Sequence, residues 1–169
     1  AADYNGHDGW IYGYDELHSF YRIDPATGKA EKLSNVPAYQ TIYDMAYDYS
    51  TGYMYALGLN ANAVYSINRV DLRTGRLEIL ATSDHPYNTL ACSTEGTLYS
   101  VDGVNGAIVT LEIQDGEIHS EVLLNTGLGT IYFIQSMAYD HNQDKLIWTA
   151  LSGAGDQIFW IDPVSGDFM

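Results

Sequence analysis

One acidic stretch of the sequence has the ligand spacing of a cation-binding loop. Asp140, Asn142 and Asp144 alternate along the chain, so on a tight turn their side-chain oxygens can point at one hard cation. Lys145 stands where an EF-hand has glycine, and Leu151 stands at the twelfth position instead of glutamate. Asp140, Asn142 and Asp144 are therefore candidate metal ligands outside an EF-hand; we expect no cofactor, with calcium at these residues as the alternative. The alternative is a hairpin turn whose residues serve backbone geometry alone.

A second group of polar residues precedes three small residues, Ala46, Cys92 and Ala138. Tyrosine offers flat stacking surfaces, and asparagine and glutamine offer donors and acceptors, a mixture that suits carbohydrate or peptide recognition. The alternative is a water-filled structural channel in which these groups bind water and one another. The predicted ligand-binding residues are Tyr39, Gln40, Tyr43, Asp44, Tyr87, Asn88, Thr89, Gln135 and Ser136.

The sequence lacks the usual arrangements of catalytic residues. No nucleophile elbow, zinc-binding helix motif or phosphate loop occurs. A glycosidase-type centre at Asp44 needs a second carboxylate about 5–10 Å away, but the corresponding positions hold Leu90 and Ser136. No two histidines have metal-ligand spacing, and we expect all five at the surface: His7, His18, His85, His119 and His141. We therefore expect a protein that is not an enzyme.

Charge excludes two classes of partner. The 22 Asp and Glu residues against 7 Lys and Arg give a formal net charge of −15, which repels nucleic-acid phosphates and anionic lipid. Apolar runs are far shorter than the ~20 residues that span a bilayer, so membrane insertion is not expected. Cys92 is the single cysteine and cannot form an internal disulfide.

Two independent motifs repeat with one period. The sequence DPATG at 24–28 returns as DLRTG at 71–75 and DPVSG at 162–166. The sequence MAYD at 45–48 returns at 137–140, and Ala46, Cys92 and Ala138 are separated by 46 residues each. This indicates one partial repeat domain over 1–169, with units at about 1–38, 39–85, 86–131 and 132–169.

Each unit reads as four short strands separated by turns. In the second unit the predicted strands are 41–47, 52–57, 63–70 and 76–81, rich in Tyr, Ile, Val and Leu. No sustained helical period occurs, so little helix is expected. Four antiparallel strands in ~40–45 residues are typical of a propeller blade. We predict an all-β fold, a β-propeller of about four blades with Ala46, Cys92 and Ala138 at the crowded axis.

The chain resembles a known group of repeats. Residues 21–28 together with 44–57 are similar to the propeller repeats of bacterial exported and surface proteins, related to YVTN, PQQ-like and NHL-like propellers. The resemblance covers nearly the whole chain. It implies a propeller fold, while such propellers serve as adhesins, scaffolds, ligand sensors and, less often, enzymes.

These observations lead to one expected function and two alternatives. We expect an extracellular, non-catalytic binding or adhesion module that recognises a glycan or protein ligand at the mouth of the propeller channel. The alternatives are a self-assembling surface-layer or fibre subunit, and a propeller-type lyase or glycosidase. The chain begins without methionine, and its acidic, tyrosine-rich composition with few lysines favours an extracellular or cell-surface location.

The repeat phase predicts an incomplete ring. The sequence starts within a first strand and ends where a fourth strand of the last unit is due. Exposed strand edges and sheet faces then favour pairing with further units, supplied by the remainder of a larger propeller or by a second copy in a homo-oligomer.

Overall fold

The computed structural model describes residues 1–34, 40–129, 131–132 and 135–169, and it is all-β over these residues, without helix. Tyr39 lies outside the described residues.

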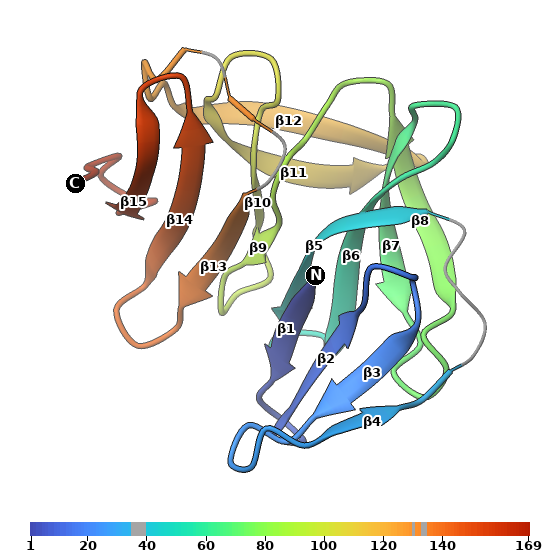
Figure 1. The fold of residues 1–169 in the computed structure, drawn as a ribbon. Helices are drawn as coiled ribbons and strands as arrows, with labels where there is room; N and C mark the ends of the chain where they lie inside the picture. Colours follow the sequence, from blue (N-terminus) through green and yellow to red (C-terminus); the bar gives the residue numbers. More distant parts are fainter. Residues whose placement is uncertain (35–39, 130, 133–134) are drawn as a thin grey trace.

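Four consecutive groups of strands, which we call units 1 to 4, make up the molecule (Figure 1). Unit 1 contains β1 (Ala2–Asn5), β2 (Trp10–Tyr14), β3 (Phe20–Ile23) and β4 (Ala30–Lys32). Unit 2 contains β5 (Thr41–Asp48), β6 (Tyr53–Leu59), β7 (Tyr65–Val70) and β8 (Leu77–Ser83). Unit 3 contains β9 (Ala91–Cys92), β10 (Leu98–Val101), β11 (Ile108–Gln114) and β12 (Glu117–Leu124). Unit 4 contains β13 (Ser136–Asp140), β14 (Lys145–Ser152) and β15 (Gly155–Ile161).

Neighbouring strands within a unit pair antiparallel in chain order. Units 2 and 3 join into one eight-stranded sheet through a single parallel bridge between Thr82 of β8 and Glu117 of β12. The first strands of the units, β1, β5, β9 and β13, lie side by side near the middle of the molecule, and later strands lie farther out (Figure 1). The predicted strands of unit 2 are confirmed to within two residues.

The core lies between successive units. One apolar cluster joins unit 1 to unit 2 through residues such as Phe20 and Met45, and a second joins unit 2 to unit 3 through Leu57 and Leu90. The third joins units 3 and 4 and contains the fully buried Trp148. Because units 2 and 3 are covered on both faces, their central strands β6, β7 and β10 are buried on both sides, and even polar residues of these strands such as Ser66, Asn68 and Ser100 are buried.

Strand pairing corrects one predicted equivalence. Ala46 pairs with Tyr55 and Ala138 pairs with Ile147, whereas the matching pair in unit 3 is Ala91 with Tyr99. Cys92 instead pairs with Leu98. Eight positions separate Ala91 from its partner Tyr99, whereas nine separate Ala46 from Tyr55, so the assumed 46-residue spacing misaligned this strand by one residue.

Units 1 and 4 stand at the two ends of the series, and each has one sheet face against which no further unit of the described chain packs. On unit 4 this face carries Ile158 and Trp160, which are 64% and 37% exposed. Ile158 of unit 4 is equivalent to Ile67 of unit 2, because Ile158 pairs with Thr149 as Ile67 pairs with Leu57. Unit 3 buries Ile67, whereas Ile158 is exposed.

Gly75 fits a turn that must also contact the neighbouring unit. Its φ of 70° is in the left-handed region, and a Cβ there would lie 2.4 Å from the Cβ of Phe20. Its carbonyl accepts a hydrogen bond of 2.6 Å from the Tyr14 hydroxyl. Gly28 closes the corresponding turn of unit 1 at φ 69° with nothing within 4 Å of its Cβ position.

We expect Gly75→Ala to lower the free energy of unfolding more than Gly28→Ala does. Both variants bear the cost of a positive φ, about 1 kcal/mol, but only the first also forces units 1 and 2 apart, at a further cost of about 1–3 kcal/mol. Chemical denaturation of the two variants measures the difference. Equal losses would show that the contact between Gly75 and Phe20 does not hold the units together.

The expectation that further units complete the ring stays a prediction. If a second copy covers the exposed face of unit 4, sedimentation should show concentration-dependent association, and Ile158→Asp should weaken it. Val122→Asp changes a similarly exposed residue on the outermost strand of unit 3 and serves as the matched control. A monomer at all concentrations contradicts the two-copy arrangement.

Candidate functional site

The Asp44 carboxylate connects the first strands of three units. Its Oδ2 accepts backbone N–H groups from Leu90 at 3.0 Å and Met137 at 3.1 Å, and its Oδ1 accepts the N–H of Met45 at 3.1 Å. The hydroxyl of Ser136 donates to Oδ1 at 3.2 Å. Met45, Leu90 and Met137 each precede an equivalent alanine, so one side chain binds the same position of units 2, 3 and 4.

Burial dominates the electrostatics of Asp44. The side chain is 3% exposed, and burial raises the pKa of Asp44 to about 7, although its hydrogen bonds to Leu90, Met137, Met45 and Ser136 lower it. All four donors belong to the protein itself, so this carboxylate supports the junction of the strands.

The other predicted ligand-binding residues are mostly engaged within the protein. Gln40 bonds Ser66 and Asn68, Tyr87 donates to Ser120, and Thr89 Oγ1 accepts the N–H of Val101. Gln135 accepts the indole N–H of Trp148 at 2.8 Å. Tyr43 is half-buried and stacks on Tyr65 with ring centroids 6.1 Å apart. The structure thus brings Asp44 and Ser136 together and uses the remaining polar groups for packing.

Asn88 differs from this group. It is 1% exposed, and neither its side-chain nitrogen nor its oxygen has a hydrogen-bond partner among the described residues. Its backbone N–H donates to Val101, and Gly103 leaves room beside its side-chain oxygen. A buried amide of this kind requires a partner such as an ordered water.

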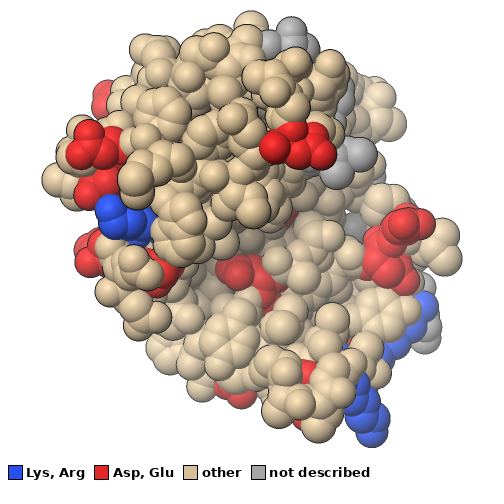
Figure 2. All heavy atoms as spheres, turned by 60° about the vertical axis from the view of Figure 1, so that its left-hand side comes forward, with Lys and Arg blue, Asp and Glu red and all other residues tan. Residues whose placement is uncertain are grey.

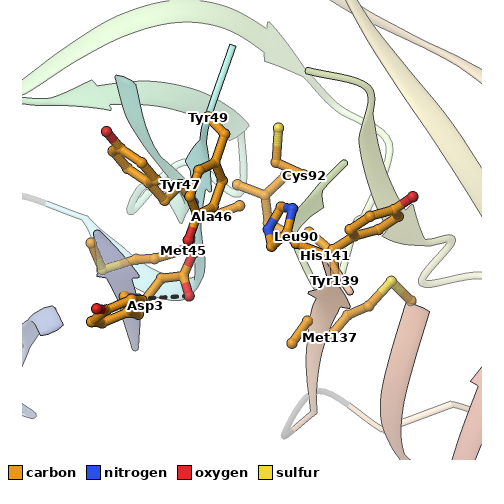
Figure 3. A pocket seen from close by; sticks show the side chains of 13 residues that line it. Asp3, Met45, Ala46, Tyr47, Tyr49, Leu90, Cys92, Met137, Tyr139 and His141 are labelled. Atoms are coloured by element: carbon orange, nitrogen blue, oxygen red, sulfur yellow. Dashed lines mark hydrogen bonds between the residues drawn. The ribbon is translucent and has the colours of Figure 1, made fainter. Parts of the chain in front are cut away.

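A cavity of about 150 Å³ lies where the first strands of all four units meet, beyond Asp44 along β5 (Figure 3). In the view of Figure 3, Asp3 and Tyr47 lie on one side of it, and Met137 and Tyr139 lie on the other. Its apolar lining contains Met45, Ala46, Leu90, Ala91, Cys92, Met137 and Ala138. Its polar and aromatic lining contains Asp3, Tyr4, Tyr47, Tyr49, Tyr139 and His141.

Asp3 takes the position that alanine holds in the other units. It pairs with Tyr12 as Ala46 pairs with Tyr55. Its Oδ2 accepts the N–H of Tyr47 at 2.6 Å and its Oδ1 accepts the N–H of Tyr4 at 2.8 Å. Burial raises the pKa of Asp3, and these two backbone hydrogen bonds act in the opposite direction.

His141 follows β13 and borders the cavity. Its Nδ1 lies 2.9 Å from Thr94 Oγ1, and its ring lies 4.3 Å from the ring of Tyr49 and 5.1 Å from that of Tyr139, centroid to centroid. Burial lowers the pKa of His141, while the negative charges of Asp140, Asp144 and Glu95 oppose this shift. The imidazole is therefore neutral at pH 7.

Two other groups at the cavity are protonated at neutral pH. Burial raises the pKa of the Cys92 thiol and of the Tyr139 hydroxyl to about 12 each. A thiol that keeps its proton is a poor nucleophile. Of these three groups, His141 is the one suited to accept a proton at neutral pH.

The predicted calcium ligands form a hairpin turn. Asp140 Oδ1 accepts the backbone N–H groups of Asn142 at 2.9 Å and Gln143 at 3.3 Å, and Asp144 adopts a φ of 52°. No group of three or more His, Cys, Asp or Glu side chains within the described ranges could hold a metal ion. Calcium at Asp140, Asn142 and Asp144 stays a prediction, and the hydrogen bonds support a role in the turn.

Sequence reasoning missed the cavity residues although it contained a signal for them. Tyr49 and His141 both follow the repeated Tyr-Asp pair, at 47–48 and 139–140, so they share a repeat phase. The expectation that all five histidines lie at the surface is wrong for His141, which is half-buried between Tyr49 and Tyr139.

The chain belongs to the family DUF6923, described as a repeat of unknown function, whose model matches residues 1–89. None of the curated proteins matches the chain. No helix within the described part of the chain is long and apolar enough to cross a membrane.

Several solved structures share the fold. A gluconolactonase from Xanthomonas campestris is 18% identical with a TM-score of 0.63, over 99% of this chain and 59% of that one. Regucalcin, a calcium-binding protein from Agrobacterium tumefaciens, is 17% identical with a TM-score of 0.62, over 100% and 58%. Virginiamycin B lyase from Staphylococcus aureus is 16% identical with a TM-score of 0.59, over 99% and 53%. The chain thus spans somewhat more than half the length of these propeller-like proteins.

The comparisons correct the expected function. The prediction of a non-catalytic binding or adhesion module, and of a protein that is not an enzyme, is contradicted because similar structures are a gluconolactonase and a lyase. At these identities the likeness itself establishes a common fold.

We expect Asp44→Asn to destabilise the fold by about 2 kcal/mol or more. The amide NH₂ of asparagine would face backbone donors, leaving at least one buried N–H unsatisfied. Asp156→Asn, on the exposed part of β15, is the matched control and should change stability by less than about 0.5 kcal/mol. Chemical denaturation measures both.

The loss of stability caused by Asp44→Asn should depend on pH. Because the folded-state pKa of Asp44 is raised to about 7, its titration favours the folded state most below the unfolded pKa, and this contribution is lost as pH rises through 7. Asparagine does not titrate, so the stability gap between wild type and Asp44→Asn should narrow between pH about 4 and about 8. A constant gap contradicts the raised pKa.

Proposed function

We propose that this chain forms the main part of a propeller-type lyase, with the cavity between the first strands as its active site. We assign units 1 to 4 as four blades, with the eight-stranded sheet as two blades joined at one bridge. The observation that carries the proposal is His141, a neutral imidazole that borders the cavity and is held by Thr94.

The contacts of His141 suit a general base. When Nδ1 carries the proton and donates it to Thr94 Oγ1, Nε2 keeps a lone pair. In an elimination, Nε2 takes a proton from carbon, the C–H electron pair forms the double bond, and the bond to the leaving group breaks. The imidazolium can return that proton to the leaving group. Asp140, Asp144 and Glu95 stabilise the imidazolium electrostatically.

The cavity suits a lyase better than a glycosidase. Glycoside hydrolysis uses two carboxyl groups facing one bond, and Asp3 is the single carboxylate lining the cavity. Asp44 is held by protein donors and does not line it. The lyase of S. aureus supports the proposal, because a histidine-to-alanine variant of that protein is described as catalytically inactive.

The likeness to regucalcin, a calcium-binding protein, also raises the question of a metal. The described residues offer no group of three His, Cys, Asp or Glu that could hold one, so no step is assigned to a metal. An extracellular or cell-surface location stays a prediction.

We expect His141→Ala to abolish elimination activity, by about 100-fold or more, because it removes the base. The assay uses a panel of compounds with a leaving group β to a carbonyl, and follows the ultraviolet absorbance of the double bond formed. His119→Ala, an exposed histidine on β12, is the matched control and should retain full activity. Because burial lowers the pKa of His141, turnover should fall with acid only below pH 6.5.

Two results would overturn the lyase proposal. One is the absence of turnover over the whole panel by the folded protein. The other is activity that survives in His141→Ala at the level of His119→Ala.

A further inference from the structure

The charged lining of the cavity is negative and has no positive counterpart. Among the residues that the structure describes, Asp3 is the one acidic residue in its lining, and no lysine or arginine lines it. Within the described ranges, Asp3 takes part in no ion pair with a lysine, arginine or histidine. Each oxygen of the carboxylate accepts one backbone N–H and keeps further acceptor capacity.

Aromatic rings form much of the remaining wall. Tyr4, Tyr47, Tyr49 and Tyr139 line the cavity with His141. The rings of Tyr47 and Tyr49 are 5.1 Å apart, and Tyr49 continues to His141 at 4.3 Å. The faces of such rings carry negative electrostatic potential, which attracts cations and is strongest when water is excluded.

The size and surroundings of the cavity suit a small organic cation. About 150 Å³ is enough for one small ring or a methylated ammonium group. The face in Figure 2 is hollowed in its middle, acidic side chains lie in and around the hollow, and Lys and Arg lie toward the edge. With a net charge of −15, the protein also concentrates cations near its surface.

A metal ion fits the cavity less well than an organic cation. Hard cations such as calcium take six to eight oxygen ligands, whereas Asp3 is the single carboxylate here and most of the wall is apolar or aromatic. A methylated ammonium group instead gains from apolar contact, from ring faces and from one carboxylate.

We propose that the cavity binds the methylated ammonium group of a cationic substrate, with Asp3 as its counter-ion and the tyrosine rings as its wall. This inference rests on the proposed function, because it names the substrate class of the same site. In this arrangement Asp3 binds and orients the substrate, while His141 takes the proton from a neighbouring carbon of the substrate.

The test compares two small probes of equal shape. Choline carries a quaternary nitrogen, and dimethylbutanol has a carbon atom in its place. Titration followed by NMR should show saturable binding of choline and binding of dimethylbutanol at least about tenfold weaker, since a desolvated cation–aromatic contact contributes about 1–2 kcal/mol. Equal affinity for the two probes, or no saturable choline binding, overturns the proposal.

Two pairs of variants locate the site. Asp3→Asn should weaken choline binding about tenfold or more and leave dimethylbutanol binding unchanged, whereas Asp156→Asn, an exposed carboxylate, should change neither. Tyr49→Leu should weaken choline binding, and Tyr53→Leu, at an exposed tyrosine, should not. An equal loss in Asp3→Asn and Asp156→Asn would assign the effect to overall charge and overturn the proposal. Thermal unfolding confirms that each variant is folded.

The two proposals can fail separately. Choline has no leaving group β to a carbonyl, so its binding reports recognition alone. Choline binding without turnover on any compound rejects the lyase and supports the cation site, whereas turnover without choline binding rejects the cation site and leaves the lyase.

Discussion

The arrangement of the units depends on one buried carboxylate. Within the described residues, the first strand of each unit pairs with the second strand of its own unit and not with another first strand, so no continuous sheet joins them. The backbone N–H groups of Met45, Leu90 and Met137 therefore need an acceptor from elsewhere, and Asp44 supplies it for all three. A buried N–H without an acceptor costs about 1–3 kcal/mol, so the identity of this single residue affects three units at once.

Equivalent positions of the repeat have acquired different roles around this carboxylate. Asp44, Thr89 and Ser136 each directly precede an equivalent N–H donor. Asp44 accepts that group from three units, Thr89 Oγ1 accepts the N–H of Val101, and the Ser136 hydroxyl donates to Asp44. Sequence reasoning recognised these positions as polar and near the axis. It could not show that they face one another, because mutual hydrogen bonding and ligand binding require the same residue types.

The predictability of the fold follows from where turns are fixed locally. Glycines such as Gly52 and Gly75 end the strands of unit 2 at positive φ, so its strands could be predicted to within two residues. The misplaced Cys92 shows the limit. The equivalent residues are Ala46, Ala91 and Ala138, so the units are unevenly spaced, but Cys92 stands at the even spacing and spacing alone could not reveal the shift. The cavity depends on side chains from all four units, and its residues could be predicted only in part, through the repeat phase shared by Tyr49 and His141.

The two carboxylates near the axis differ in how completely the protein satisfies them. Asp44 accepts four hydrogen bonds from three units, so it has little capacity for a ligand. Asp3 accepts two, and it stands where the other units have an alanine, at the edge of a cavity lined by tyrosine rings. A desolvated carboxylate with few donors gains most from an added positive charge. The departure of unit 1 from the repeat therefore places an incompletely satisfied carboxylate at the same cavity as the neutral imidazole of His141, and this asymmetry distinguishes the cavity from the structural junction at Asp44.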